Sequence, residues 1–229
     1  KMFLDFAIMN YTPFMSVFDV EPPIIEKKHL IKWLKTNYSF LTNKSFKLYK
    51  LNSERDINFV IFIQNKKKYV LKISNPSEEL DILKYQDRLI DHLGSSKDLK
   101  KFIPQICHKK IVKYLDKKNR ECFVRILSYI EGQMYGDINT NTVIEKSLGE
   151  LLGKISIQLK SFFDKAAYRK FIWDPSNINW IYKDIKIFTG NKKLILLKCF
   201  SEYKKFVKDN LKKLRYSITH SDPNNFNLV

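Results

Sequence analysis

After one helical stretch, apolar and polar residues begin to alternate along the chain. In residues 24–37 the apolar positions recur at helical spacing and share one face: Ile24, Leu30, Ile31 and Leu34. From residue 46 the period becomes two, which predicts three strands: 46–51, 58–63 and 69–73. The polar residues 65–67 are expected to link the last two strands as a hairpin. The pattern therefore predicts a helix followed by an antiparallel sheet.

A second helix is expected after the third strand. Asn75 can cap it, Pro76 suits its first position, and Glu78 stands where a capping box places its acid. The expected buried stripe consists of Leu83, Ile90 and Leu93. Gln86 falls on the same stripe and needs a hydrogen-bond partner there. It either bonds Lys72, one strand back, or reaches solvent at the edge of the stripe.

Further strands are predicted at 102–106, 111–115 and 122–130, the last two as a hairpin across residues 116–119. The apolar run ends at Glu131-Gly132. This site suits a hinge whose free backbone groups meet an adenine, although any strand-to-loop junction would show the same sequence pattern.

Beyond the hinge the pattern becomes helical. Thr142 and Glu145 have the spacing of a capping box. The first helical stripe consists of Leu148, Leu152, Ile155, Leu159 and Phe162. A long helix at 193–214 is expected to bury Leu196, Phe200, Val207, Leu211 and Leu214.

Composition then excludes several classes of protein. At 229 residues, 44% hydrophobic and 14% aromatic, the chain can form one large or two-lobed domain with a core. No apolar run reaches the length of a membrane span and no secretory signal opens the sequence, so no membrane partner is expected. The three cysteines are widely spaced without a C-x-x-C pair, which argues against disulfides or zinc and favours the cytoplasm: Cys107, Cys122 and Cys199.

The net charge of +18 allows two interpretations. It suits a nucleic-acid or anionic-lipid partner, or it reflects a solvated lysine-rich surface that also suits anionic nucleotides. The lysines are scattered, arginine is scarce and no RNA-binding aromatic motif is present. The second interpretation is favoured, and no nucleic acid is expected as a partner.

Lys72 stands alone in an otherwise apolar strand, on the face opposite Leu71 and Ile73. Such a lysine either lies on an exposed edge or holds the α- and β-phosphates of a nucleotide, as the third-strand lysine of a phosphotransferase does. The polar turn at 52–57 lies where a nucleotide kinase carries its phosphate-covering loop. It has no glycine, and an ordinary hairpin turn fits it equally well.

The end of the chain carries His220, Asp222 and Asn227 at the spacing H-x-D-x-x-x-x-N. Pro223 and the neighbouring asparagines are typical of a turn. In a phosphotransferase the Asp takes the proton of the attacking hydroxyl and the Asn helps hold magnesium. An ordinary polar turn between strands has the same spacing. A β-rich half, a hinge, helices and then this loop are the order of a two-lobed kinase, an α+β fold with the nucleotide between its lobes.

In this order the motifs resemble the aminoglycoside phosphotransferase and choline kinase superfamily, from about residue 24 to the end. Residues 51–59 are similar to the L-x-x-E-R-D-x-N-F of hydroxylysine kinase and of phosphotransferase domains fused to class III aminotransferases. Other similar segments are 69–76 with Gln86 and His92-Leu93, 125–132, 148–154, and Trp173-Asp174. The final loop resembles the family's H-G-D-x-x-x-x-N, with Ser221 in place of the glycine.

The resemblance implies transfer of the γ-phosphoryl of ATP or GTP, with Mg²⁺, to a hydroxyl of an amino alcohol, with a hydroxylysine-like acceptor favoured. Asp222 would be the catalytic base and Asn227 would bind the metal. The nucleotide would be bound by Lys72, Ser53, Asn58, Gln86 and Ile130. Of these, Ser53 to Asn58 would cover the phosphates, residues near Ile130 would meet the base, and Gln86 stands where many relatives pair the lysine with Glu. His220 would support the loop.

The implied architecture is a two-lobed protein-kinase-like fold. Residues 1–23 would be an extension, 24–130 a β-rich nucleotide-binding N-lobe with one helix, and 131–229 a mainly helical partial C-lobe. The chain opens with Lys1 and closes in what reads as an unfinished strand, so we expect a C-terminally truncated piece with little or no turnover alone.

Two other functions stay open. One is a catalytically inactive kinase-like module that binds nucleotide and regulates a fused or partner enzyme. The resemblance makes a PLP-dependent aminotransferase-fold domain the partner to consider. The other is a basic RNA-associated protein, which ranks well behind.

Overall fold

The computed structural model describes residues 20–108, 110–168, 176, 178–208 and 210–229. The chain divides into two compact units, one of residues up to 155 together with 222–229, and one of residues 156–221. The lobe boundaries expected at residues 24 and 131 stay predictions.

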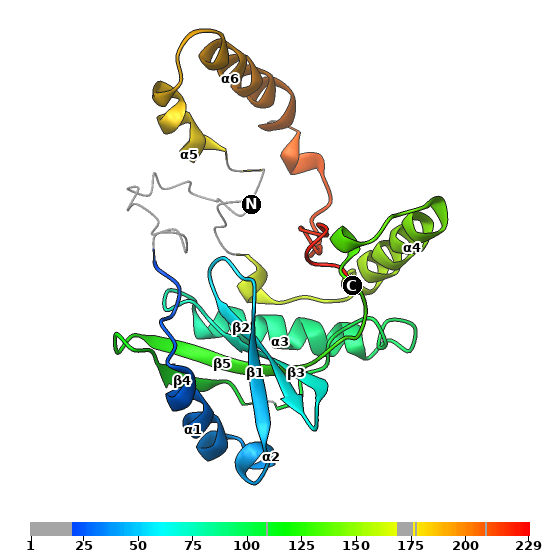
Figure 1. Cartoon of the computed structure of the whole chain (residues 1–229). Helices are drawn as coiled ribbons and strands as arrows, with labels where there is room; N and C mark the ends of the chain where they lie inside the picture. Colours follow the sequence, from blue (N-terminus) through cyan, green and yellow to red (C-terminus); the bar gives the residue numbers. More distant parts are fainter. Residues whose placement is uncertain (1–19, 109, 169–175, 177, 209) are drawn as a thin grey trace, which may run out of the picture. The chain divides into compact units, whose positions relative to one another are not determined.

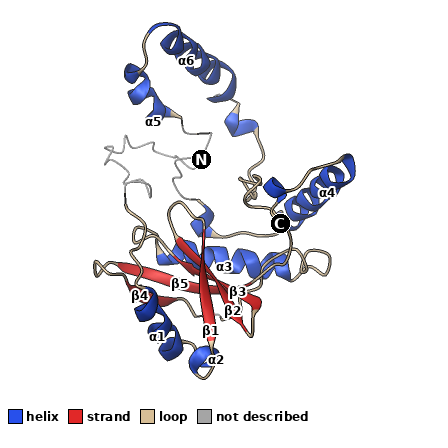
Figure 2. Cartoon of the chain, viewed as in Figure 1, coloured by secondary structure: helices blue, strands red, loops and turns tan. Residues whose placement is uncertain are grey.

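A five-stranded antiparallel sheet forms the centre of the first unit (Figure 2). Its strands are β1 (Phe46–Leu51), β2 (Ile57–Ile63), β3 (Lys66–Ile73), β4 (Val112–Leu115) and β5 (Glu121–Ser128). They lie in the order β1-β2-β3-β5-β4, so β3 is the central strand. Lys72 therefore does not lie on a sheet edge, and the α+β class predicted from the sequence is confirmed.

Helices cover both faces of this sheet (Figure 1). On one face α1 (Lys27–Asn37) and α2 (Ser39–Thr42) bury Leu30, Leu34 and Leu41 completely. They pack on strand residues that include Leu48, Ile61, Leu71, Ile73 and Ile126. Because successive strand residues point to opposite faces, Lys72 points away from this core. It points to the face covered by α3 (Leu80–Gly94).

The remaining elements are helical, as the sequence predicted. They are η1 (Tyr135–Asp137), α4 (Thr142–Leu159), η2 (Lys165–Ala167), α5 (Asn179–Tyr182), η3 (Lys183–Ile187), α6 (Gly190–Glu202), η4 (Tyr203–Lys208) and η5 (Leu211–Lys213). In the second unit Leu159, Ile185 and Phe200 are buried. The Tyr182 ring meets Phe200 edge-on at 5.2 Å. None of the described helices is long and apolar enough to span a membrane.

Two predicted junctions lie elsewhere in the structure. The β2–β3 link is the two-residue turn Gln64-Asn65, both with positive φ (51° and 59°), so Lys66 and Lys67 belong to β3. The helix expected at residue 75 begins only at Leu80, because Asn75 forms a turn of its own in which its Oδ1 accepts from the Ser77 N–H at 2.9 Å.

Three further predictions also need correction. Residues 102–106 form no strand, since Pro104 cannot donate to a ladder, and only a single bridge joins Ile106 to Leu127. Helix α4 is capped by Asn141, whose Oδ1 accepts the N–H groups of residues 143 and 144 at 3.0 Å. The helix predicted at 193–214 ends at Glu202. The π-turns of η4 then change its phase, which leaves Val207 38% and Leu214 60% exposed.

The β4–β5 hairpin turn is closed by the buried carboxylate of Asp116. Arg120 donates to it through Nη2 at 2.7 Å and through Nε at 3.0 Å, and the Ile24 N–H donates at 3.1 Å. Burial alone would raise the pKa of Asp116, but these bonds and those from the backbone of residues 118 and 120 lower it to about 2.

We expect the Asp116→Asn variant to lose about 2 kcal/mol of stability at pH 7. The folded-state pKa of Asp116 lies below its unfolded value of about 3.9. Its contribution is therefore complete above pH 4 and is lost as the pH falls toward 2. Urea unfolding of both proteins from pH 7 to pH 2 measures this. A stability difference that stays constant across the window would contradict the assignment.

Candidate functional site

Three polar side chains form a row across the middle of the sheet. Asn58 of β2 is paired with Lys72 of β3, and Lys72 is paired with Arg125 of β5. Residues directly opposite in an antiparallel ladder share one face. All three therefore lie on the face that α3 covers, opposite the apolar core.

Lys72 has an electrostatic environment unlike that of the surface lysines. In the described part of the chain, no hydrogen bond or ion pair joins its ammonium to another side chain. Burial lowers the pKa of Lys72, and the positive charges of Arg125 and Arg55 lower it further, while Asp56 opposes them. Beside it, the Oδ1 atom of Asn58 is buried and accepts no hydrogen bond from the described residues. Two unmet polar groups side by side cost folding free energy, which is typical of a ligand site.

Gln86 does not bond Lys72, and it does not simply reach solvent. Its Oε1 accepts from Arg125 Nη2 at 2.6 Å, and the adjacent Asp87 accepts from Arg125 Nη1 at 2.7 Å. Arg125 also donates to the carbonyl of Leu83 at 3.3 Å. The two interpretations of Gln86 drawn from the sequence are therefore both wrong, because its amide oxygen is hydrogen-bonded to the buried Arg125 of β5.

The loop before β2 is held without glycine. Ser53 Oγ donates to the carbonyl of Asp56 at 2.5 Å, and Asp56 Oδ1 accepts the N–H of Asn75 at 3.0 Å. Arg55 forms an ion pair with the buried Glu78 at 2.7 Å. Side-chain bonds thus tie residues 53–56 to the segment after β3, which explains why Asn75 and Glu78 are not available to start α3.

The final loop brings Asp222 and Asn227 together. Asn227 Nδ2 donates to Asp222 Oδ2 and to the Asp222 carbonyl, both at 3.0 Å. Asn224 Nδ2 donates to Asp222 Oδ1 at 2.9 Å. Ser221, in the place of the family's glycine, has φ +65° and so adopts the left-handed conformation that a glycine there would favour. His220 is exposed, and no described hydrogen bond links it to the loop.

This loop docks on the segment that follows β5. The N–H groups of Tyr135 and Gly136 donate to the carbonyls of Leu228 and Asn225, both at 3.0 Å. A Cβ on Gly136 would lie 3.1 Å from the Cβ of Asn225, and one on Gly132 only 2.6 Å from Val229 Cγ1. The predicted hinge therefore meets the final loop. Ile130 is half-buried just before it.

The Gly136→Val variant is expected to push the final loop off this segment. The matched control is Gly149→Ala in α4, where an added Cβ meets nothing within 4 Å and helix propensity predicts a gain of about 1 kcal/mol. Hydrogen exchange at the N–H groups of residues 135 and 136 measures docking. Unchanged protection in Gly136→Val would show that the close approach is unimportant.

The final loop offers oxygen ligands for a magnesium ion. The amides of Asn224 and Asn227 each donate to the Asp222 carboxylate, and because Asn227 does so through Nδ2, its amide oxygen is left for a cation. Mg²⁺ prefers such oxygen ligands and takes few of them from the protein when phosphates supply others. Among the described residues, no group of three or more His, Cys, Asp or Glu offers a stronger metal site. The residues therefore fit a phosphate-bound magnesium.

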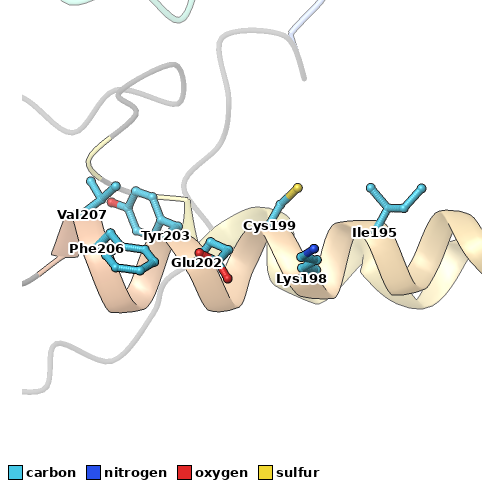
Figure 3. Close-up of a pocket in the computed structure, with 7 residues that line it drawn as sticks. All are labelled: Ile195, Lys198, Cys199, Glu202, Tyr203, Phe206 and Val207. Atoms are coloured by element: carbon cyan, nitrogen blue, oxygen red, sulfur yellow. The ribbon is translucent and has the colours of Figure 1, made fainter.

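An open, apolar hollow on the second unit contains none of the predicted site residues (Figure 3). It runs along α6 and η4 and is lined by Ile195, Lys198, Cys199, Glu202, Tyr203, Phe206 and Val207. Its polar groups are one ammonium, one carboxylate, a phenol hydroxyl and a thiol among apolar side chains, and none of them was predicted to bind a nucleotide.

Sequence reasoning missed Arg125 as a site residue, although the strand that carries it was expected. The pattern was present, because Arg125 is the one basic residue in the apolar run 122–128, just as Lys72 is in the run 69–73. The similar segment Trp173-Asp174 and most of the predicted extension 1–23 lie outside the described residues.

The fold is kinase-like. A structure with this fold is that of amicoumacin kinase hAmiN, solved in complex with AMP-PNP, Ca²⁺ and Ami. The match has a TM-score of 0.52 at 14% identity and covers 84% of this chain and 58% of that kinase. At this identity the likeness establishes the fold, and it confirms the predicted protein-kinase-like architecture. Neither a protein-family model nor a curated protein sequence matches the chain.

Proposed function

We propose that the chain is part of a small-molecule kinase, which transfers the γ-phosphoryl group of ATP or GTP to a hydroxyl of an amino alcohol. The observation that carries the proposal is the Lys72 ammonium beside the Asn58 oxygen, neither of which has a partner among the described residues, on the central strands of a kinase-like fold. A half-buried cation that no described side chain pairs is suited to an anionic ligand. The AMP-PNP and Ca²⁺ in the amicoumacin kinase support a nucleotide and a divalent metal as the ligands.

The proposed roles follow from the geometry of each residue. Lys72 binds the phosphates, residues 53–56 cover the phosphates, and the Asn58 side chain lies beside Lys72. The backbone near Ile130 meets the base. Gln86 acts indirectly, through Arg125. Asn227, with Asp222 beside it, holds Mg²⁺, which when bound neutralises charge on the phosphate oxygens.

Asp222 orients the acceptor hydroxyl and takes its proton. As the acceptor oxygen forms its bond to the γ-phosphorus, the bond from that phosphorus to the β,γ-bridging oxygen breaks, and the nucleoside diphosphate leaves with the electron pair. The hydrogen bonds from Asn224 and Asn227 hold both carboxylate oxygens in a fixed orientation. Positioning of this kind is the main contribution that a protein makes to phosphoryl transfer.

The acceptor class rests on the sequence resemblance, which favours a hydroxylysine-like amino alcohol. A fused or partner aminotransferase-fold domain is proposed on the same basis, and a cytoplasmic location is proposed because the three cysteines are widely spaced without a C-x-x-C pair. The experiment is a nucleotide-consumption screen of the full-length protein with Mg²⁺ against hydroxylysine, ethanolamine-like alcohols, homoserine and aminoglycosides. Consumption that depends on one acceptor supports the proposal.

The alternative is a nucleotide-binding module without chemistry. It is favoured by one observation, that the predicted partner of Lys72 on α3 is neutral and is bonded elsewhere. MgATP binding by the full-length protein without acceptor-dependent consumption would select this alternative. Absence of binding would exclude both functions.

A further inference from the structure

Arg125 carries a set of contacts that the proposed mechanism does not use. Its side chain is 6% exposed and makes three hydrogen bonds, all to α3: to Gln86 Oε1, Asp87 Oδ1 and the Leu83 carbonyl. Two of these are charge-assisted and short, at 2.6 and 2.7 Å, which places them among the stronger polar contacts that proteins make.

The position of Arg125 relates these contacts to Lys72. The two residues are paired across β3 and β5 and point to the same face. Gln86 and Asp87 are the polar groups that α3 presents to Arg125, and Arg125 donates a hydrogen bond to one oxygen atom of each. Lys72 is left without a partner among the described residues, and its ammonium stays available to an anion.

From this arrangement we propose that Arg125 is a positioning residue, which fixes α3 over the sheet and withholds Asp87 from Lys72, so that Lys72 binds the nucleotide phosphates. The inference rests on the proposed nucleotide site. It gives α3 a specific role, because movement of α3 away from Arg125 would free the Asp87 carboxylate to pair with another cation. Loss of the Arg125–α3 contacts would then weaken nucleotide binding without any change in a residue that touches the nucleotide.

The test is the dissociation constant of MgATP for the full-length protein and its variants. Arg125→Met is expected to weaken binding about tenfold, a size typical of coupling through a packed network. Adding Asp87→Leu removes the competing carboxylate, so the double variant Arg125→Met/Asp87→Leu is expected to recover most of the lost affinity. A purely structural role for Arg125 predicts no recovery.

Two controls keep the outcomes distinct. Arg120→Met breaks a similar ion pair, to the fully buried Asp116, and should leave MgATP affinity unchanged in the folded protein. Arg125→Met leaves the Asp87 carboxylate without its cation, which costs stability. The double variant avoids this cost, so its MgATP affinity can be measured even if the single variant fails to fold. Circular dichroism checks folding.

The outcomes separate this inference from the proposed function. If Lys72→Met loses MgATP while Arg125→Met and the double variant both bind like the wild type, the positioning role is wrong and the nucleotide site stands. If the double variant binds as weakly as Arg125→Met, competition by Asp87 is wrong. If the wild-type protein and all variants, Lys72→Met included, bind MgATP equally, the proposed function itself fails.

Discussion

Asp222→Asn is expected to lower the kcat of the full-length protein by about 10²–10⁴-fold, the range of a general-base contribution. The carboxylate is the only acid in the final loop, and both of its oxygens are oriented by hydrogen bonds from asparagine side chains. An amide at this position cannot take the hydroxyl proton. The KM for nucleotide should change much less than kcat, since the proposed phosphate-binding residue, Lys72, lies on the sheet.

The measurement is steady-state kinetics with the acceptor found in the screen. Asp184→Asn is a matched control, because Asp184 is exposed in η3 and belongs to no part of the proposed site. An amide at residue 222 also faces the amides of Asn224 and Asn227, so docking of the loop is checked by hydrogen exchange. Near-normal turnover in Asp222→Asn, with the final loop still docked, would contradict the role of Asp222 as the general base.

Lys72→Met is expected to weaken MgATP binding by about 10–100-fold, the loss of one charge-assisted hydrogen bond to phosphate. The same change should raise stability against urea by about 1 kcal/mol, because it replaces a partly desolvated ammonium, which no described side chain pairs, with an apolar side chain of similar length. Opposite effects on binding and on stability distinguish a ligand-binding lysine from one that holds the fold together.

Lys68→Met is the matched control on the same strand, where the lysine is exposed. The wild-type affinity should also fall as pH rises, earlier than for an ordinary lysine. Burial lowers the pKa of Lys72, and the neutral amine has no charge to offer the phosphates. Equal affinity for MgATP in Lys72→Met and Lys68→Met would contradict the role assigned to Lys72.

The local pattern of apolar and polar residues was sufficient to predict most of the helices and strands of the first unit. The alternation in residues 46–73 predicted β1, β2 and β3 because one face of each strand is buried and a period of two marks that burial. The stripe predicted for α1 was correct in part: Leu30 and Leu34 are fully buried, but the helix begins at Lys27, so Ile24 lies outside it and is 38% exposed. The order of the strands could not be predicted from the sequence. Whether Lys72 lies on an edge strand or in the interior of the sheet was therefore decided only by the structure.

Wrong predictions arose where a polar side chain had a distant partner. Asn75 has the residue type of a helix cap, yet its amide reaches the carbonyls of Val20 and Arg55, and α3 starts five residues later. Gln86 was correctly expected to need a partner, but the partner was Arg125, 39 residues along the chain. Spacing along a sequence identifies a polar group in an apolar stripe but does not say what it meets across the fold.

The candidate site was predicted in part, and for a physical reason. Asp222 and Asn227 lie within one short loop, so their spacing along the chain is enough to predict that they lie close together. The contact of this loop with residues 132–136 depends on small residues at 132 and 136 and on backbone hydrogen bonds, which carry no pattern in the sequence.

The central claim is that the chain holds a magnesium nucleotide through Lys72 on the sheet and Asn227 on the final loop. Calorimetric titration of the full-length protein with ATP, with and without Mg²⁺, tests it most directly. We predict that the wild-type protein binds ATP more tightly with Mg²⁺, that Asn227→Ala loses this metal-dependent gain, and that Lys72→Met binds weakly in both conditions. No binding by the wild-type protein, or the same affinity in all three proteins with and without the metal, would contradict the claim.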